Sequence, residues 1–169
     1  MIRPARVDDA EAIARLHVRS WQAAYRGIVS DEFLDSMSVD QMASRWRQRL
    51  EEAATPTLVT ERGGEVVGFA HVGPSRDDPD SGRGGELYAI YLEPSAWGLG
   101  LGRDLLAASR QKLAELGFQA AMLWVLRDNE RARRFYFADG WRLDGAEKPI
   151  SIGGSELVEV RYQRSIQAT

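Results

Sequence analysis

A glycine-rich segment, placed between an apolar run and a helical pattern, constrains the fold of this chain more than any other feature. Glycine stands at every second position within Trp97-Gly98-Leu99-Gly100-Leu101-Gly102-Arg103. Glycine lets the backbone turn sharply and come close to a ligand, and the free N–H groups at a helix start attract an anion. The segment therefore predicts either a loop that binds a phosphate-bearing ligand or a loop that only turns a corner.

The glycine spacing argues against two common nucleotide-binding motifs. A P-loop ends in Gly-Lys followed by Ser or Thr, whereas Gly102 is followed by Arg103 and Asp104. A dinucleotide fingerprint, Gly-x-Gly-x-x-Gly, would need its third glycine at Arg103 or Leu105. The flanking sequence must therefore distinguish the remaining possibilities.

The segments around the loop predict an ordered series of strands and helices. Residues 85–93 are apolar and aromatic and stop at Pro94, which indicates a strand. Leucines recur at helical spacing after the loop until Gly117, and a short buried strand is expected over residues 120–126. A short helix then begins at Asn129 and is closed by Gly140.

Two segments, the glycine-rich segment that begins at Trp97 and the predicted helix from Asn129 to Gly140, serve below as the two motif blocks. In these two blocks the chain resembles the GNAT superfamily of acyl-CoA-dependent N-acyltransferases. The first family signature, Gln/Arg-x-x-Gly-x-Gly/Ala, is matched by Trp97-x-x-Gly100-x-Gly102 except at its first position. The second signature, Asn-x-x-Ala-x-x-Phe-Tyr followed by Gly-aromatic, is matched at Asn129, Ala132, Phe135, Tyr136, Gly140 and Trp141. The opening residues 2–10 also look like the family's first strand and helix, so the resemblance covers essentially the whole chain.

The resemblance implies a single α/β (α+β) domain over residues 1–169. Its central sheet would be mixed and mostly antiparallel, with six to seven strands flanked by about four helices, and acetyl-CoA would enter where two central strands splay apart. Outside the two blocks, the sequence predicts one helix from the Asp8/Asp9 cap to Tyr25 and another from the capping box at Ser38 and Gln41. Strands are expected over residues 57–60, 66–72 and 156–163, and an exposed loop over 74–85.

Composition restricts the environment and the partners of the chain. A length of 169 residues suits one domain, and the net charge of −3 gives no general attraction to nucleic acid or to an anionic membrane. The absence of cysteine excludes disulfides and thiolate metal sites, and the N-terminus lacks the apolar run of a signal peptide. We therefore expect a cytoplasmic monomer or homodimer that binds neither nucleic acid nor membrane and holds no metal.

The resemblance makes acetyl-CoA the expected acyl donor, bound by both blocks. The N–H groups from Gly98 to Arg103 are expected around its pyrophosphate, where the positive end of the following helix adds to the attraction. The resemblance also implies that the backbone of residues 90–92 hydrogen-bonds the pantetheine arm as an added strand would. Asn129 could contact this arm or only cap its helix, and Arg133 shares its helix face. The expected cofactor-binding residues are Ile90, Tyr91, Leu92, Trp97, Gly98, Leu99, Gly100, Leu101, Gly102, Arg103, Asn129 and Arg133.

Trp97 is the position at which the chain departs from the first signature. It replaces a Gln or Arg of the family, so a polar or charged contact near the pyrophosphate would be missing. Because the main phosphate donors are backbone groups, binding of acetyl-CoA is expected to survive this change.

Direct acetyl transfer needs a neutral amine, stabilisation of the developing oxyanion and a proton for the departing thiolate. Tyr136 matches the family's general acid, and a phenol with a reference pKa of about 10 can donate toward a thiolate whose conjugate acid has a pKa of about 8.5. Tyr136 could instead pack as an amphipathic core residue. Glu86 is the candidate base, because it lies eleven residues before Trp97, an offset that resembles that of the base glutamate in some family members. A polar residue at an exposed strand start is its alternative role, and His71 or water is the alternative base.

The acceptor side carries no decisive motif. Trp21 and Tyr25 follow His17 at four-residue spacing, which is typical of a packing face but could line an acceptor pocket together with His71. We therefore predict transfer of an acetyl group from acetyl-CoA to a primary amine by direct attack in a ternary complex, with a small-molecule amine favoured. A protein or peptide N-terminus or a lysine is the alternative acceptor, and a module that senses acyl-CoA without catalysis is the alternative function.

Overall fold

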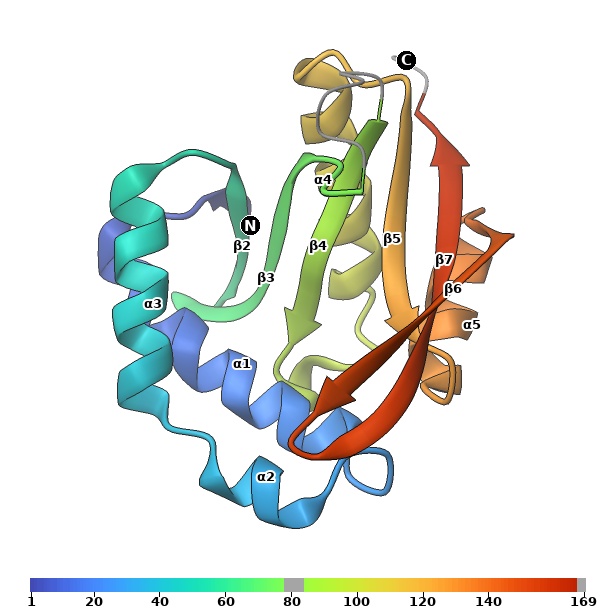
Figure 1. The fold of residues 1–169 in the computed structure, drawn as a ribbon. Coiled ribbons are helices and arrows are strands. Elements are labelled where there is room, and N and C mark those ends of the chain that lie inside the picture. The colour runs from blue at the N-terminus through green and yellow to red at the C-terminus, as the bar shows by residue number, and fades with distance from the viewer. Residues whose placement is uncertain (78–83, 167–169) are drawn as a thin grey trace.

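Seven strands form one mixed sheet in the computed structural model, which describes residues 1–77 and 84–166 (Figure 1). The strands are β1 (Ile2–Pro4), β2 (Thr57–Arg62), β3 (Glu65–Pro74), β4 (Gly84–Leu92), β5 (Ala120–Leu126), β6 (Arg142–Ile152) and β7 (Ser155–Ser165). Their order across the sheet is β1-β2-β3-β4-β5-β7-β6. Among the described strands only β4 and β5 pair in parallel, so the predicted mixed, mostly antiparallel sheet is confirmed.

Five α-helices occur in the described residues, one more than the sequence predicts. They are α1 (Ala10–Ala24), α2 (Asp31–Ser36), α3 (Val39–Glu52), α4 (Leu101–Glu115) and α5 (Glu130–Ala138). Helix α3 begins as its capping pattern predicts, because Ser38 Oγ accepts a hydrogen bond from Gln41 N–H at 3.2 Å. Asp9 does not cap α1 with its side chain, since its carboxylate instead binds Arg3 at 2.7 Å and ties the helix to β1. The additional helix, α2, has only six residues and no periodic pattern to announce it.

The parallel pair at the centre of the sheet opens along its length. Backbone pairing joins residues 84–86 of β4 to residues 120–122 of β5 and extends no further. From residue 87 onward, β3 is the only described strand that pairs with β4, while β5 stays paired with β7 (Figure 1). The predicted splay of two central strands is therefore confirmed, and it leaves one edge of β4 free over residues 87–92.

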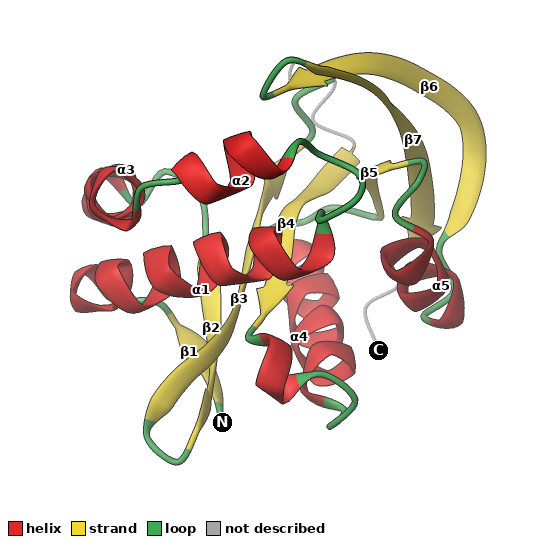
Figure 2. Cartoon of the chain, turned by 90° about the horizontal axis from the view of Figure 1, so that it is seen from below, coloured by secondary structure: helices red, strands yellow, loops and turns green. Residues whose placement is uncertain are grey.

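Helices cover both faces of the sheet (Figure 2). On one face α1 and α3 pack over β2 and β3, where Ile13, Trp46 and Phe69 are fully buried. On the other face α4 and α5 share a core with the central strands that contains Leu106 and Tyr136. Burying a large apolar side chain contributes about 1.5–3 kcal/mol, so both cores hold the strands firmly on either side of the opening.

The β6–β7 hairpin extends past β5 and curves toward α2 (Figures 1 and 2). Gly153 at its tip has a φ of 57°, and a Cβ added there would overlap the side chain of Phe33 on α2. Ser30 Oγ donates a hydrogen bond to Gly153 O at 3.4 Å. Apolar side chains of the hairpin pack with Leu34 and with the last turns of α1. The hairpin tip and α2 therefore form one wall beside the C-terminal end of α1.

Two segments differ from the sequence-based expectation or lie beyond it. The sequence does not place β6, because Gly145 and Pro149 interrupt its pattern, and the register shifts between Leu143 and Glu147 as in a β-bulge. The expected loop over residues 74–85 lies largely outside the described residues, with Pro74 ending β3 and Gly84 beginning β4. No helix within the described ranges is long and apolar enough to cross a membrane.

Candidate active site

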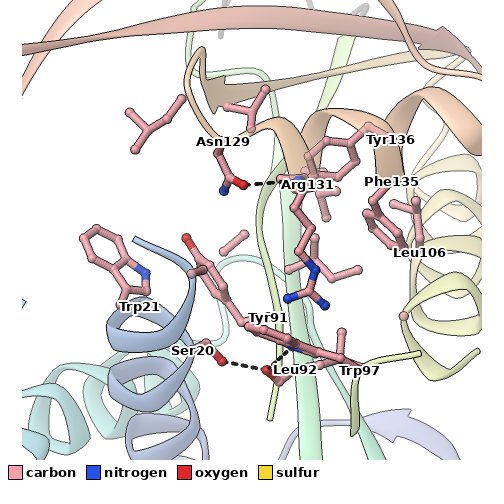
Figure 3. A pocket seen from close by; sticks show the side chains of 18 of the residues that line it. Ser20, Trp21, Tyr91, Leu92, Trp97, Leu106, Asn129, Arg131, Phe135 and Tyr136 are labelled. Carbon is pink, nitrogen blue, oxygen red and sulfur yellow. Dashed lines mark hydrogen bonds between the residues drawn. The ribbon is translucent and has the colours of Figure 1, made fainter. Parts of the chain in front are cut away.

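A cavity of about 600 Å³ occupies the opening between β4 and β5. Its walls come from the end of α1, β4, the glycine-rich loop, the start of α4, β5, α5 and the β6–β7 hairpin (Figure 3). A volume of this size is typical of small-molecule sites. The two motif blocks, which are separate in the sequence, therefore meet in one place.

The glycine-rich loop forms one end of the cavity, where α4 begins. Gly98 and Gly100 have φ values of 78° and 82°, and none of the described atoms would contact a Cβ added at either position. The first backbone hydrogen bond of α4 runs from Asp104 N–H to Gly100 O at 3.2 Å. The N–H groups of residues 101–103 therefore have no intrahelical acceptor and can meet an anion.

Trp97 and Arg131 join the two motif blocks at the cavity wall. The guanidinium carbon of Arg131 lies 3.3 Å from the centroid of the Trp97 ring, in a stacked cation–π arrangement (Figure 3). Trp97 Nε1 donates to Leu92 O at 3.1 Å, and Ser20 Oγ donates to the same oxygen at 2.8 Å. The position where the family carries Gln or Arg thus holds an indole that supports an arginine from the second block.

Tyr136 and Asn129 bring α5 to the cavity. Tyr136 is only 9% exposed, and burial, followed by the nearby Tyr91 hydroxyl, raises its pKa above the ordinary value. The phenol therefore keeps its proton at neutral pH. Asn129 Oδ1 accepts a hydrogen bond from Ala132 N–H at 3.2 Å, and Asn129 also lines the cavity (Figure 3). Asn129 therefore caps α5 and also stands in the cavity wall, and its contact with the pantetheine arm stays a prediction.

Glu86 is buried on β4 but is not among the residues that line the cavity. One of its carboxylate oxygens accepts the Arg76 backbone N–H at 2.8 Å, and the other accepts the Arg76 guanidinium at 2.6 Å. Glu86 stands in the last residue pair before β4 and β5 separate. Both oxygens are therefore engaged by Arg76 at the closed side of the opening.

Both histidines of the chain are held in the protein interior, and neither lines the cavity. On β3, His71 Nδ1 lies 2.8 Å from Thr57 Oγ1 and His71 Nε2 lies 3.1 Å from Thr55 Oγ1. On α1, His17 Nδ1 accepts a hydrogen bond from Trp46 Nε1 at 3.2 Å. Burial lowers the pKa of each imidazole to about 4. Neither imidazole therefore reaches the cavity, in which the sequence predicts that His71 contacts the acceptor.

Trp21 and Tyr25, on the last turns of α1 and at its end, line the cavity and also pack against α2 and the hairpin. The Tyr25 and Tyr91 hydroxyls are joined by a hydrogen bond of 3.1 Å, and burial raises the pKa of both. Trp21 Nε1 is buried and has no hydrogen-bond partner among the described residues. The side chains of the predicted packing face therefore also reach the cavity, and their contact with an acceptor stays a prediction.

Glu159 on β7 also lines the cavity, and the sequence does not single it out. It pairs with Leu126 of β5 and Lys148 of β6, and its side chain is 17% exposed. Burial raises the pKa of Glu159, while Lys148 and Arg76 oppose the rise. The one signal in the sequence is an acidic residue between apolar neighbours, Leu157-Val158 and Val160, within the predicted last strand.

Other residues expected at the site divide into two groups. Arg133 donates to Arg127 O at 2.9 Å and to Tyr162 Oη at 3.2 Å, and it lies outside the cavity wall. Leu99 and Leu101 are not in the wall either. The expected residues that do line it are Ile90, Tyr91, Leu92, Trp97, Gly98, Gly100, Gly102, Arg103, Asn129, Tyr136, Trp21 and Tyr25. Within residues 1–77 and 84–166, no three His, Asp or Glu side chains gather in a way that could hold a metal ion.

Known proteins with the same sequence pattern support the interpretation of the two blocks. Residues 11–139 match the acetyltransferase (GNAT) family. The uncharacterized N-acetyltransferase YuaI of Bacillus subtilis is 33% identical over 159 residues, which cover 94% of this chain and 89% of that protein.

Solved structures share the fold over nearly the whole chain. The PaiA N-acetyltransferase of Thermoplasma acidophilum, solved in complex with coenzyme A, has a TM-score of 0.74 at 20% identity and covers 98% of each chain. YncA of Salmonella typhimurium, solved with acetyl-CoA, has a TM-score of 0.76 at 23% identity and covers 100% of this chain and 95% of that one. As its two motif blocks predict, the chain belongs to the GNAT family of N-acetyltransferases.

Proposed function

We propose that the chain binds acetyl-CoA in the opening between β4 and β5 and transfers the acetyl group to a primary amine by direct attack in a ternary complex. The observation that carries this proposal is the single cavity in which the glycine-rich loop, the free edge of β4 and Tyr136 meet. The solved relatives with coenzyme A and acetyl-CoA have the same fold, which supports the same donor here.

The residues at the loop end fit the phosphates of acetyl-CoA. The free N–H groups of residues 101–103 would bind the pyrophosphate, and the positive end of α4 would contribute about 0.3–1 kcal/mol. Arg103 and Arg131 both stand in the cavity wall and would supply positive charge. Arg131, stacked on Trp97, would thus provide the side-chain contact that the replacement at position 97 removes.

The free edge of β4 fits the pantetheine arm, whose amides resemble a peptide backbone. Residues 87–92 of β4 have no strand partner on the side of the opening, so their backbone groups can receive an added strand. Leu92 O already accepts hydrogen bonds from Ser20 and Trp97, which restricts the contact to the residues before it. The amide of Asn129 would reach the same arm from the opposite wall.

Tyr136 would give a proton to the thiolate that leaves when the amine attacks. Its phenol is in the cavity wall, and its raised pKa keeps it protonated, so that the hydroxyl can give its proton to the sulfur as negative charge develops there. The amine must first lose a proton of its own. Glu86 would serve as that base only through water and after releasing Arg76, and both ring nitrogens of His71 stand beside threonine hydroxyls.

The part of the cavity lined by Trp21, Tyr25, Ile150 and Ile152, which we call the acceptor end, favours a small molecule as the amine. The β6–β7 hairpin, against which α2 packs, bounds this end, and Trp21, Tyr25, Ile150 and Ile152 narrow it. A lysine on the surface of a folded protein would have to pass this wall, whereas a small amine or a thin peptide end would not. The acidic, cysteine-free composition is what supports a cytoplasmic site for the reaction.

The proposal is tested by measuring acetyl-CoA turnover with a panel of arylalkyl and aliphatic amines, polyamines, amino acids, aminoglycosides and peptides. Thiol release gives the rate, and mass spectrometry identifies the acetylated product. We expect N-acetylation of a small amine. Product from peptides alone would move the acceptor to a protein terminus, and tight acetyl-CoA binding without any product would favour an acyl-CoA sensor.

A further inference from the structure

The two ends of the cavity carry opposite charges. Arg103 and Arg131 stand at the loop end, beside the free N–H groups of α4, and Glu159 stands in the wall formed by β7. The wall contains one other carboxylate, Asp139, which is already neutralised by Arg164 at 2.8 Å and by Arg110 at 3.0 Å. Among the described residues of the wall, Glu159 is therefore the carboxylate with the least compensated charge.

Glu159 stands in surroundings that suit one added cation. Within residues 1–77 and 84–166, its nearest cationic group is Lys148 Nζ, at 3.7 Å from Oε2, which is beyond hydrogen-bond length. The tyrosines Tyr25 and Tyr91 line the same cavity as Glu159, and burial, with a smaller contribution from the charge of Glu159, raises the pKa of both. Among the described residues, the charged and titratable groups around Glu159 include Lys148 of β6, Arg76 after β3, Glu86 and Tyr91 of β4, and Tyr25 at the end of α1. An ammonium group of the same kind as that of Lys148 would complete the hydrogen bonds of the carboxylate.

The rest of the acceptor end is apolar and aromatic. Its side chains are Trp21, Tyr25, Tyr91, Trp124, Ile150 and Ile152. Aromatic and aliphatic walls favour a ligand with an apolar body, and the described residues of the wall offer a second positive charge no carboxylate other than the paired Asp139. One weakly compensated carboxylate in such a wall therefore fits an amine with a single positive charge better than it fits a polyamine.

We propose that Glu159 binds the ammonium group of a small monoamine with an apolar body and takes the proton that the amine must lose before it attacks. This inference rests on the proposed function, since it concerns the acceptor in the same cavity. Tyr136, from α5, and Glu159, from β7, would then act on the leaving sulfur and on the attacking nitrogen respectively.

The proposed step balances. Glu159 takes one proton from the ammonium, and the neutral nitrogen forms a bond to the thioester carbonyl carbon while the carbon–sulfur bond breaks. Tyr136 gives its proton to the sulfur and recovers one from the nitrogen of the new amide. Glu159 returns its proton to water, so one acetyl group is transferred and one proton is released for each turnover.

Glu159→Gln removes the charge and the base but keeps the shape of the side chain. We expect the KM for phenethylamine to rise by about tenfold or more, because a charge-assisted hydrogen bond is lost, while acetyl-CoA binding stays unchanged. We also expect kcat/KM of the variant to rise steadily with pH, since only amine that is already neutral can react. Glu156→Gln, the same change at an exposed position of β7, is the matched control.

The outcomes separate this inference from the proposed function. If the wild type acetylates no amine, the proposed function fails, and calorimetric binding of phenethylamine in the presence of coenzyme A still tests the ammonium site. If the wild type is active but Glu159→Gln keeps its KM and pH profile, or if Glu86→Gln changes them instead, the assignment to Glu159 is overturned. If the wild type prefers spermidine to phenethylamine, the proposal that the acceptor is a monoamine is overturned. Calorimetric binding of coenzyme A shows whether the Glu159→Gln variant remains folded. The variant Glu159→Asp, which keeps the carboxylate, is the conservative comparison.

Discussion

The two ends of the cavity are built in different ways. The loop end consists mainly of backbone groups from one continuous segment, residues 97–103, with glycines whose φ values a side chain would strain. The acceptor end consists of side chains that α1, β4, β5 and the β6–β7 hairpin contribute from distant parts of the sequence. The first end needs a particular backbone shape, whereas the second needs particular side chains in a folded sheet. Because substitutions of side chains can change the acceptor end without changing the backbone of the loop end, this division favours one constant donor and an acceptor that differs between related proteins.

Gly100→Val should break the loop end and produce the largest effect. A branched side chain at a φ of 82° is strained and would occupy the space in which we propose that the phosphate approaches the backbone. We expect the affinity for coenzyme A to fall by about a hundredfold, which corresponds to about 2.7 kcal/mol, as measured by calorimetry.

Gly64→Val is the control for this strain. Gly64 lies in the β2–β3 turn with a φ of 84°, and none of the described atoms would contact a Cβ added there either. It should lower the free energy of unfolding by about 1–3 kcal/mol and leave coenzyme A binding intact. Equal loss of affinity in both variants would mean that the loop glycines serve only the fold.

Tyr136→Phe tests the chemistry between the two ends. Loss of the proton donor should lower kcat by about a hundredfold with little change in the KM for either substrate. Tyr162→Phe is the matched change, because Tyr162 is also buried in the same core but does not line the cavity. Steady-state rates over a range of pH decide the matter, and an unchanged kcat with chemistry shown to be rate-limiting would remove Tyr136 from the mechanism.

Arg131→Ala sharpens the comparison by removing a side chain from the loop end. We expect acetyl-CoA affinity to fall by about three- to tenfold and to depend less on salt, because one exposed cation is lost. Arg134→Ala, on the same helix, is the control, since the Arg134 side chain is 74% exposed and pairs with Glu130. Trp97→Arg should also change the affinity, because it removes the ring that supports Arg131 and the hydrogen bond to Leu92. If neither substitution changes the affinity, this pair belongs to packing alone.

His71→Gln should have the smallest effect on activity and a visible effect on stability. Burial lowers the pKa of His71 from 6.5 to about 4, so below pH 6.5 the unfolded chain takes up a proton that the folded chain refuses. Stability therefore falls as the pH falls, by about 2 kcal/mol at pH 5 for this group. Urea unfolding between pH 7 and pH 5 should show a weaker loss in the variant. A shift in the pH profile of catalysis instead would make His71 part of the reaction.

The sequence predicts the loop end well because its determinants are local. The strand before the loop, the helix after it and the short helix from Asn129 to Gly140 are each set by residues within one segment, and the structure contains all three. The family and the splay of β4 and β5 follow from the resemblance that these segments carry, and both are confirmed.

The acceptor end could not be predicted in the same way because its determinants are not local. Glu86 and Glu159 are both acidic residues in predicted strands, and only the fold shows that Arg76 engages the first while the second lines the cavity. The strand β6 escapes prediction since Gly145 and Pro149 disrupt its alternation. Because neither β6 nor the short α2 is predicted, the sequence does not indicate the wall that bounds the acceptor end.

The most direct test of the account determines both Michaelis constants in the same two variants, Arg131→Ala and Glu159→Gln. If Arg131 binds acetyl-CoA and Glu159 binds the amine, Arg131→Ala raises the KM for acetyl-CoA alone and Glu159→Gln raises the KM for the amine alone. The account would be contradicted if each substitution changed both constants to the same extent, or if the effects were exchanged between the two substrates.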